Sequence, residues 1–218
     1  MPATGRTRGP YAKTAQVRER ILDACVEAFS ETGYRATTMK EIAERAGISE
    51  RGLAHHFPNK ADLLDAVLHR HQAEAAEALR GVVGAAEILV AMVDDIAEDT
   101  GKPGLVELRS ILSAEAVAPD HPAHAHYRDR YDMLRAYTTS AFETLASEGE
   151  LDAYMTPAEL AASYIALSDG LQLQWLFNRS GVDAAQTLRR FLEANIPRLR
   201  DPGTAAVAQA GTDQRSAH

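Results

Sequence analysis

The chain has 218 residues, with 23 Lys and Arg against 31 Asp and Glu, and its formal net charge is −8. A chain of this length can bury a sizeable core, divided into one small and one larger domain. The single cysteine, Cys25, excludes a disulfide within the chain. The N-terminus is polar and no run of about 18 apolar residues occurs, so we expect no signal peptide, no membrane association and a cytoplasmic location.

The charge is distributed unevenly along the chain. Residues 1–60 carry ten basic and seven acidic side chains, a net charge of +3, whereas the rest carries 13 basic and 24 acidic side chains, a net charge of −11. A basic segment joined to an acidic one suits a protein that binds DNA at one end and something else at the other. Arg6 and Arg8 could belong to an arm that reaches a minor groove, or the arm could be inert.

The first expected helix covers residues 14–32. Apolar side chains recur on one face of it, and Gly33 is expected to end it in a left-handed conformation. The apolar face consists of Ile21, Leu22, Cys25, Ala28 and Phe29.

Two shorter helices follow. Thr38 is followed three residues later by a glutamate, the pattern of a capping box, which predicts a helix over residues 38–46. Gly47 interrupts this helix, and Ser49 can cap a second one that ends near Phe57. Two short helices joined by a glycine-containing turn are typical of a helix-turn-helix, in which the second helix enters a DNA major groove. A helical hairpin that only packs is the alternative.

The rest of the chain is also expected to be helical, because it shows neither the alternation of strands nor a hairpin turn signal. Asn59, Asp120, Thr156 and Asp183 are expected to cap the helices that follow them. With the three helices before residue 60, the fold class is all-α with about nine helices. The later helices are expected at 60–79, 85–99, 105–117, 121–147, 157–179 and 183–199.

Residues 42–63 carry a longer motif. Ile42 to Ser49 reads Ile-Ala-Glu-Arg-Ala-Gly-Ile-Ser, and Leu53 to Leu63 reads Leu-Ala-His-His-Phe-Pro-Asn-Lys-Ala-Asp-Leu. This resembles the DNA-binding domain of TetR-family transcriptional regulators. Two positions depart from the family pattern: its usual phosphate-contacting Tyr is Ala54, and its frequent Gly is Arg51. The resemblance implies a three-helix DNA-binding head and a body of six helices.

The expected DNA contacts rest on where residues lie in the predicted helices and on the resemblance to the family. Thr38 lies at a helix N-terminus, where N–H groups and a hydroxyl can hold a phosphate. Arg51 can pair with guanine and Glu50 with cytosine, although Glu50 also suits a solvated helix start. His56 and Lys60 match phosphate contacts of the family, whereas His55 could contact DNA or pack under the turn. The predicted set is Thr38, Lys40, Ser49, Glu50, Arg51, His55, His56 and Lys60.

The C-terminal part shows a shorter resemblance to BetI-like regulators of the betaine pathway. It rests on Ser113 to Ala116 before Asp120-His121-Pro122, and on the segment 169–176, which reads DGLQLQWL. It implies the architecture of that subfamily and leaves the ligand open.

The resemblance also implies a homodimer, in which the last two helices of each copy form a four-helix bundle. Apolar faces at 160–177 and 188–196 fit this arrangement, although the two helices could instead cover each other within a monomer. A dimer would place two recognition helices about 34 Å apart, on successive major grooves of a palindromic operator. The predicted interface residues are Leu160, Tyr164, Leu171, Leu188 and Phe191.

A small organic effector is expected inside the body, where polar or aromatic side chains interrupt apolar faces. The aromatic residues could also be plain core. The histidines at 121, 124 and 126 with Glu115 would suit zinc, but no fourth ligand is evident, so no metal or cofactor is expected. The predicted pocket residues are Met92, Arg109, Glu115, Tyr127, Tyr131 and Trp175.

These expectations define four segments: a flexible arm at 1–12, a DNA-binding head at 13–59, an effector-binding and dimerisation body at 60–200, and a disordered tail at 201–218. The expected function is a ligand-responsive transcriptional regulator, a repressor that a small molecule releases from its operator. A DNA-binding protein without an effector is one alternative. A helical enzyme that uses Glu115 and His121 is another, but no nucleophile, phosphate-loop or cofactor motif supports it, so no enzyme is expected.

Overall fold

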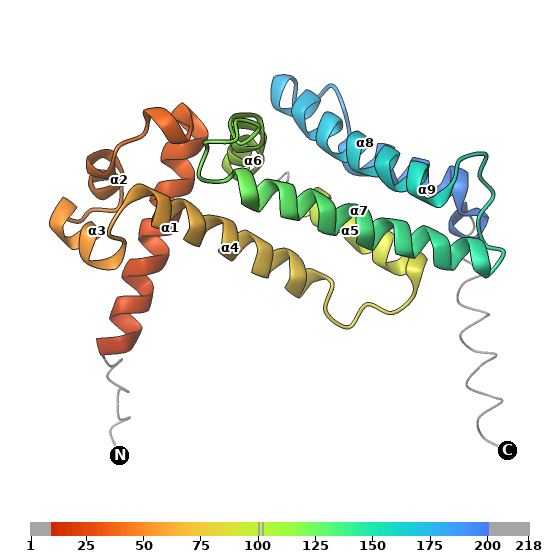
Figure 1. Ribbon diagram of the computed structural model, residues 1–218, viewed down its shortest axis with the longest axis horizontal. Helices are drawn as coiled ribbons and strands as arrows, with labels where there is room; N and C mark the ends of the chain where they lie inside the picture. The colour runs from red at the N-terminus through yellow and green to blue at the C-terminus, as the bar shows by residue number, and fades with distance from the viewer. Residues whose placement is uncertain (1–9, 100, 102, 201–218) are drawn as a thin grey trace, which may run out of the picture. The chain divides into compact units, whose positions relative to one another are not determined.

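A computed structural model describes residues 10–99, 101 and 103–200 of the chain (Figure 1). All regular structure in this part is helical, as the sequence predicted, and it consists of nine α-helices and one short 3-10 helix, η1. Among these residues no helix is both long and apolar enough to cross a membrane. The elements are α1 (Pro10–Ala36), α2 (Met39–Arg45), α3 (Glu50–His56), α4 (Lys60–Ala78), α5 (Ala85–Asp99), α6 (Pro103–Glu115), α7 (His124–Ser147), α8 (Pro157–Phe177), α9 (Ala184–Asn195) and η1 (Pro197–Arg200).

The two predicted terminal segments fall largely outside the described residues. Residues 1–9 of the expected arm and residues 201–218 of the expected tail are not described. Residues 10–12, also assigned to the arm, belong to α1, so this helix begins at Pro10 rather than Thr14. A proline is tolerated at a helix start because its missing N–H has no partner there.

The described chain forms two compact units. Unit 1 contains residues 10–74 and 104–124, and unit 2 contains the described parts of 75–103 and 125–200. Residues 104–124, which the sequence analysis assigned to the body, thus group with the helices of the head.

In unit 1, helix α2 packs against α1, and α3 packs against α2 (Figure 1). The expected caps form: the Thr38 hydroxyl accepts the N–H of Glu41 at 3.2 Å, and the Ser49 hydroxyl accepts that of Gly52 at 3.0 Å. The Glu41 carboxylate accepts a hydrogen bond from Arg45 at 3.1 Å, so α2 begins with the Thr38 half of the predicted capping box. The core beneath these helices consists of fully buried Ile21, Cys25, Phe29, Ile42, Leu53 and Leu63.

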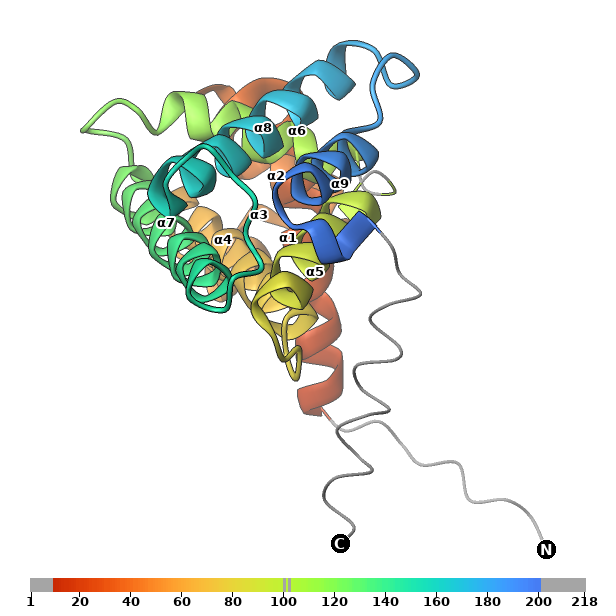
Figure 2. The same ribbon diagram turned by 90° about the vertical axis from the view of Figure 1, so that its right-hand side faces the viewer.

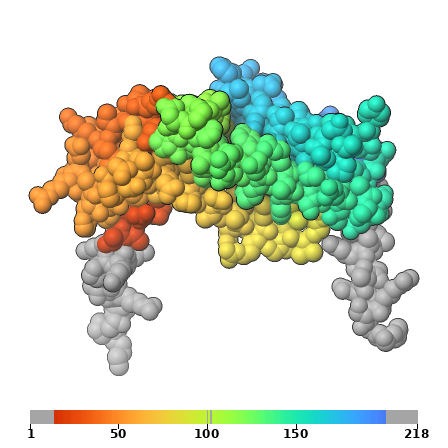
Figure 3. Space-filling model, viewed as in Figure 1, coloured from red at the N-terminus to blue at the C-terminus, as the bar shows by residue number. Residues whose placement is uncertain are grey.

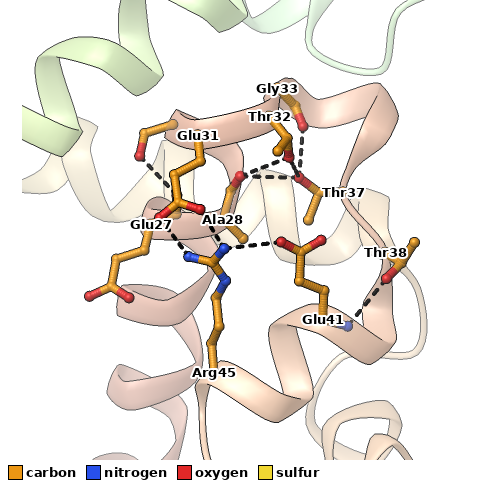
Figure 4. Close-up of polar contacts among 10 residues, drawn as sticks. Glu27, Ala28, Glu31, Thr32, Gly33, Thr37, Thr38, Glu41 and Arg45 are labelled. Carbon is orange, nitrogen blue, oxygen red and sulfur yellow. Dashed lines mark hydrogen bonds and ion pairs between the residues drawn. The ribbon is translucent and has the colours of Figure 1, made fainter.

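The connection between α1 and α2 is held by a polar network, shown in Figure 4. Arg45 of α2 binds both carboxylate oxygens of Glu31 in α1, with its Nη1 2.9 Å from Oε1. The buried hydroxyl of Thr37 lies 2.8 Å from the carbonyl oxygen of Gly33 and 3.2 Å from that of Ala28. The last turns of α1 are therefore tied to the end of α2 through Arg45, and to the segment before α2 through Thr37.

Gly33 breaks α1 at the predicted position, because its backbone is not helical and α1 joins two helical pieces there. Its backbone has φ 78° and ψ 171°, and helical structure resumes for three residues beyond it. The positive φ was predicted, but the ψ angle lies far from the left-handed helical region that a C-terminal cap occupies. A Cβ on Gly33 would lie 2.7 Å from Oε1 of Glu115, so the position combines an unusual backbone with a close approach.

Unit 2 is built from α5, α7, α8 and α9, with α9 in contact with both α5 and α8 (Figure 2). The Tyr164 hydroxyl donates to the carbonyl of Leu89 at 3.3 Å inside this core. At the surface, Arg198 of η1 binds both oxygens of Glu87 in α5, at 2.7 and 3.0 Å. The core centres on fully buried Leu89, Val93, Phe142, Leu145, Leu160, Leu188 and Leu192.

Two predicted helix ends were wrong. Helix α7 begins at His124 and not at His121, because the N–H of His121 turns back to the carbonyl of Ala118 at 3.0 Å. Asp120 therefore does not cap α7, and the ring of His121 accepts the N–H of Ala123. Helix α9 ends at Asn195, because Pro197 cannot donate a backbone hydrogen bond and a 3-10 turn follows.

We expect Gly33→Ala to destabilise unit 1 more than Gly47→Ala. Both glycines have positive φ, but a Cβ at position 47 would meet nothing within 4 Å. The Gly47 variant should lose about 1 kcal/mol from backbone strain, and the Gly33 variant about 2–3 kcal/mol, because its backbone region is nearly restricted to glycine and Glu115 must move. Urea unfolding followed by circular dichroism measures both losses. Equal losses would contradict the close approach of Glu115.

Candidate DNA-binding surface and effector region

Helix α3 presents a polar face on the surface of unit 1. Leu53 is fully buried, which fixes the orientation of a helix of only seven residues. The opposite side leaves Glu50, Arg51 and His55 exposed, together with Ala54 at the position where the family has Tyr. Figure 3 shows the segment of α2 and α3, in orange, at the surface of this unit. The face therefore brings together the residues predicted to read bases.

The predicted phosphate contacts surround this face. Thr38 and Lys40 at the start of α2 are exposed, and the Lys40 ammonium lies 3.9 Å from Glu44. Ser49 is exposed while its hydroxyl caps α3. His56 is half-buried at the rim of an open hollow of about 540 Å³. The hollow is lined by residues of α1, α4 and the end of α3, among them Arg18, Glu19, Leu22, His56, Phe57, Asp62, Asp65 and His69.

Lys60 has a different environment from the one its family match implies. Its ammonium donates to the backbone carbonyls of Tyr34, Arg35 and Thr37, at 2.7, 3.2 and 2.8 Å. It also lies 4.5 Å from the centre of the Tyr34 ring. An ammonium group has three N–H donors, and all three point to carbonyl oxygens here. Lys60 thus lies at the corner between α1 and α2. Its contact with a DNA phosphate stays a prediction.

The predicted pocket residues are divided between the two units. Arg109 and Glu115 of α6 belong to unit 1, whereas Met92, Tyr127, Tyr131 and Trp175 belong to unit 2. Glu115 accepts the backbone N–H of Tyr34 at 3.0 Å, which gives its carboxylate a partner within unit 1. The structure therefore does not bring the six residues together within one unit.

Within unit 2, polar groups adjoin the aromatic candidates. Tyr131 of α7 donates a hydrogen bond to the exposed Asp169 of α8 at 2.8 Å, and burial together with this carboxylate raises the pKa of the Tyr131 hydroxyl. Trp175 is buried, with the guanidinium of Arg179 5.2 Å from its ring centre. Met92 packs against the unit 2 core, as Tyr131 does.

The described residues hold no group of three or more His, Cys, Asp or Glu side chains arranged to bind a metal ion. His121 is almost completely buried, and His124 bonds to the carbonyl of Ala116 at 2.8 Å. Two of the three histidines considered as zinc ligands thus have structural contacts.

Four of the five predicted interface residues lie inside the core of unit 2. Leu160 and Leu188 are fully buried, and Tyr164 and Leu171 are 1% and 6% exposed. Their own chain covers them, so they have no surface to offer to a second copy. The exposed apolar side chains of α8 are Leu173 and Phe177, 48% and 86% exposed.

The expected apolar face at 160–177 includes both of these residues, but neither was among the five named for the interface. The exposed apolar stripe of α8 continues beyond them. Leu173 and Phe177 are four residues apart, and Ala162, Ala166 and Gly170 extend the same side of α8 at spacings of three and four. Helix α8 is apolar almost all round, so the pattern alone could not say which face meets α9.

Comparisons with known proteins agree with this architecture. The family described as "Bacterial regulatory proteins, tetR family" matches residues 21–67. The family described as "BetI-type transcriptional repressor, C-terminal" matches residues 85–201, more than half of the chain.

Three relatives cover most of the chain. The transcriptional activator FasR of Mycolicibacterium smegmatis is 29% identical over 190 residues, 84% of this chain and 82% of FasR. The regulator TtgR of Pseudomonas putida is 26% identical over 196 residues, 85% of this chain and 92% of TtgR. The crystal structure of a transcriptional regulator from Saccharomonospora viridis, solved in complex with choline, is 26% identical with a TM-score of 0.69, and the match covers 84% of this chain and 98% of that one.

The exposed face of α3, the all-helical body and these matches lead to one assignment. The chain belongs to the tetR family of bacterial transcriptional regulators, and its C-terminal part is of the BetI type.

Proposed function

We propose that this regulator is a homodimeric repressor that binds a palindromic operator through α3 and releases it when a small organic molecule binds in the body. The observation that carries the proposal is the face of α3, on which Glu50 and Arg51 stand exposed at the capped start of the helix. Residues at the N-terminal end of a recognition helix reach base edges in the major groove. Such a protein acts where the bacterial chromosome lies, in the cytoplasm.

The direction of regulation is supported by the C-terminal match, which is described as a repressor type. FasR, by contrast, is named an activator. The proposal of repression is tested by placing the operator upstream of a reporter gene: deletion of the regulator should raise expression. A fall in expression would make the chain an activator without changing its DNA contacts.

An enzymatic role for Glu115 and His121 finds no support in their surroundings. The Glu115 carboxylate is occupied by the N–H of Tyr34, and the side chain of His121 is 1% exposed. A general acid or base must reach a substrate proton within about 3 Å or through one water. We therefore propose a function in regulation and not in catalysis.

The DNA contact is tested at Arg51. Replacement by alanine should cost about 1–3 kcal/mol of binding to a duplex selected by the parent chain, and should relax the preference at one position in each half-site. Arg128→Ala removes the same charge from an exposed position on α7 and should leave the preference unchanged. Repeating the selection with each variant measures the effect. If Arg51→Ala weakens binding to selected and random duplexes by the same factor, Arg51 does not read a base.

The dimer contact is proposed for the exposed stripe of α8, with Phe191 of α9 half-buried in the same unit. Leu173→Glu should leave the fold intact, because this side chain is 48% exposed within its own chain. In a dimer it would bury an unpaired charge, at a cost of about 3 kcal/mol or more. Met133→Glu is a matched control, because Met133 on α7 is also 48% exposed. Sedimentation should show a dimer for the parent and the Met133 variant, and a monomer for the Leu173 variant. A monomeric parent at micromolar concentration would refute the dimer.

The effector region is proposed near Tyr131 and Trp175 in unit 2. A ligand releases DNA only to the extent that it binds the DNA-free conformation more tightly. Tyr131→Ala should keep the affinity for DNA while raising the concentration of effector needed for release at least tenfold. Tyr154→Ala, at a fully exposed tyrosine of unit 2, is the control. Release is measured as a fall in the fluorescence anisotropy of a labelled duplex, across a panel of compounds that begins with choline. A parent-like response of Tyr131→Ala to a releasing compound would place the pocket elsewhere.

A further inference from the structure

The peptide of Tyr34 is held on both of its sides by charged side chains from distant parts of the sequence. Its N–H donates to Oε2 of Glu115 at 3.0 Å, and its carbonyl accepts from the ammonium of Lys60 at 2.7 Å. Glu115 ends α6 and Lys60 begins α4, and all three residues belong to unit 1. Hydrogen bonds to ionised groups are among the stronger ones in proteins. One residue of the α1–α2 corner thus carries a charged contact on each side.

The residues around the Glu115 carboxylate leave room for it beside the Tyr34 peptide. The absence of a side chain at Gly33 makes room for the carboxylate, since a Cβ there would lie 2.7 Å from Oε1. The ring of His121 lies 5.1 Å from the Tyr34 ring. Its Nδ1 accepts the N–H of Ala123, so a neutral ring carries its proton on Nε2, which lies 3.6 Å from Oε2 of Glu115. Burial lowers the pKa of His121 and so favours the neutral ring.

Lys60 closes the same corner from the other side. Besides Tyr34 it binds the carbonyls of Arg35 and Thr37, which leaves its ammonium without an N–H for another partner. Burial lowers the pKa of Lys60, and the charge of Glu115 opposes that shift. The two charged side chains therefore act on one short segment, residues 33–37, which we call the corner segment.

The corner segment leads directly into the DNA-binding helices. Its last residue, Thr37, is buried and bonds to the carbonyl of Gly33, and the next residue, Thr38, caps α2. A shift of the segment would change the direction in which α2 leaves α1. Helix α3 would follow, because α2 and α3 pack on each other.

We propose that Glu115 and Lys60 are positioning residues for DNA binding, which fix the corner segment and so set the orientation of α3. Glu115 influences DNA binding through the hydrogen bond that its carboxylate accepts, and not through electrostatic repulsion between its charge and the DNA. This assignment rests on the proposed function, and it gives Glu115 a role in the head in place of the predicted pocket. It also makes the end of α6 the element whose movement would disturb the recognition helix.

The test compares two substitutions of Glu115 on a fluorescein-labelled duplex that the parent chain has enriched from a random-sequence library. Glu115→Ala removes the acceptor and should weaken binding about tenfold or more, whereas Glu115→Gln keeps an acceptor oxygen and should bind like the parent. Electrostatics alone predicts the opposite sign, because loss of a negative charge favours binding to DNA. Glu148 is an exposed acid just after α7, so Glu148→Ala controls for the charge and should bind like the parent. Parent-like binding by a folded Glu115→Ala variant would overturn the proposal, as would equal losses in both Glu115 variants.

Hydrogen exchange supplies a readout of the corner itself. In Glu115→Ala, peptides that span residues 33–38 should exchange faster than in the parent, while peptides of α8 and α9 keep their protection. Unchanged exchange at residues 33–38 would contradict the role of Glu115 as acceptor, whatever the binding result.

Lys60→Met provides a second variant if Glu115→Ala does not fold. If Lys60 is a positioning residue, Lys60→Met should weaken binding to the selected duplex more than binding to a random one. The salt dependence of binding should then stay close to the parent's. If Lys60 instead grips a phosphate, both duplexes should lose affinity alike and the slope of log K against log salt should fall by about one. That second result would overturn the role given to Lys60. A parent chain that enriches no duplex at all would refute the proposed function and not the corner contacts.

Discussion

A helix of seven residues is not stable in water by itself, and both helices of the DNA-binding element have that length. They persist because each buries an apolar face, through Ile42 and Leu53, and because Thr38 and Ser49 satisfy N–H groups at their starts. Each such cap contributes about 1 kcal/mol. The position of α3 therefore depends on the parts of unit 1 that pack around it. Among these, the corner segment is held mainly by polar contacts.

Arg45, Thr37 and Lys60 belong to different helices or turns, yet all of them act on the joint between α1 and α2. Because several polar contacts meet at this joint, the recognition helix keeps a fixed direction without a large core. The same arrangement also makes the joint sensitive to α6, whose terminal Glu115 binds the Tyr34 peptide. A regulator needs such a joint, because small shifts at one element must alter the fit of another to DNA.

The sequence predicted the helical fold and most helix boundaries, because caps at Ser49, Thr156 and Asp183 and the apolar faces are local signals. It also predicted that Glu50 and Arg51 lie at the start of the second short helix. It could not predict that Lys60 turns to backbone carbonyls or that Glu115 reaches Tyr34, 81 positions away, because both depend on tertiary approach. Three residues of α8 that were expected at the interface lie in the core of unit 2 for a related reason: an almost uniformly apolar helix does not indicate which side its own chain covers.

The central claim is that two copies of α3 read successive major grooves. Methylation interference on the enriched duplex tests it directly, because methyl groups at guanine N7 block contacts in the major groove. The account predicts two clusters of interfering guanines, related by twofold symmetry and separated by about 10 base pairs or a multiple of that spacing. A single cluster of guanines, or interference only from adenines methylated at N3 in the minor groove, would contradict it.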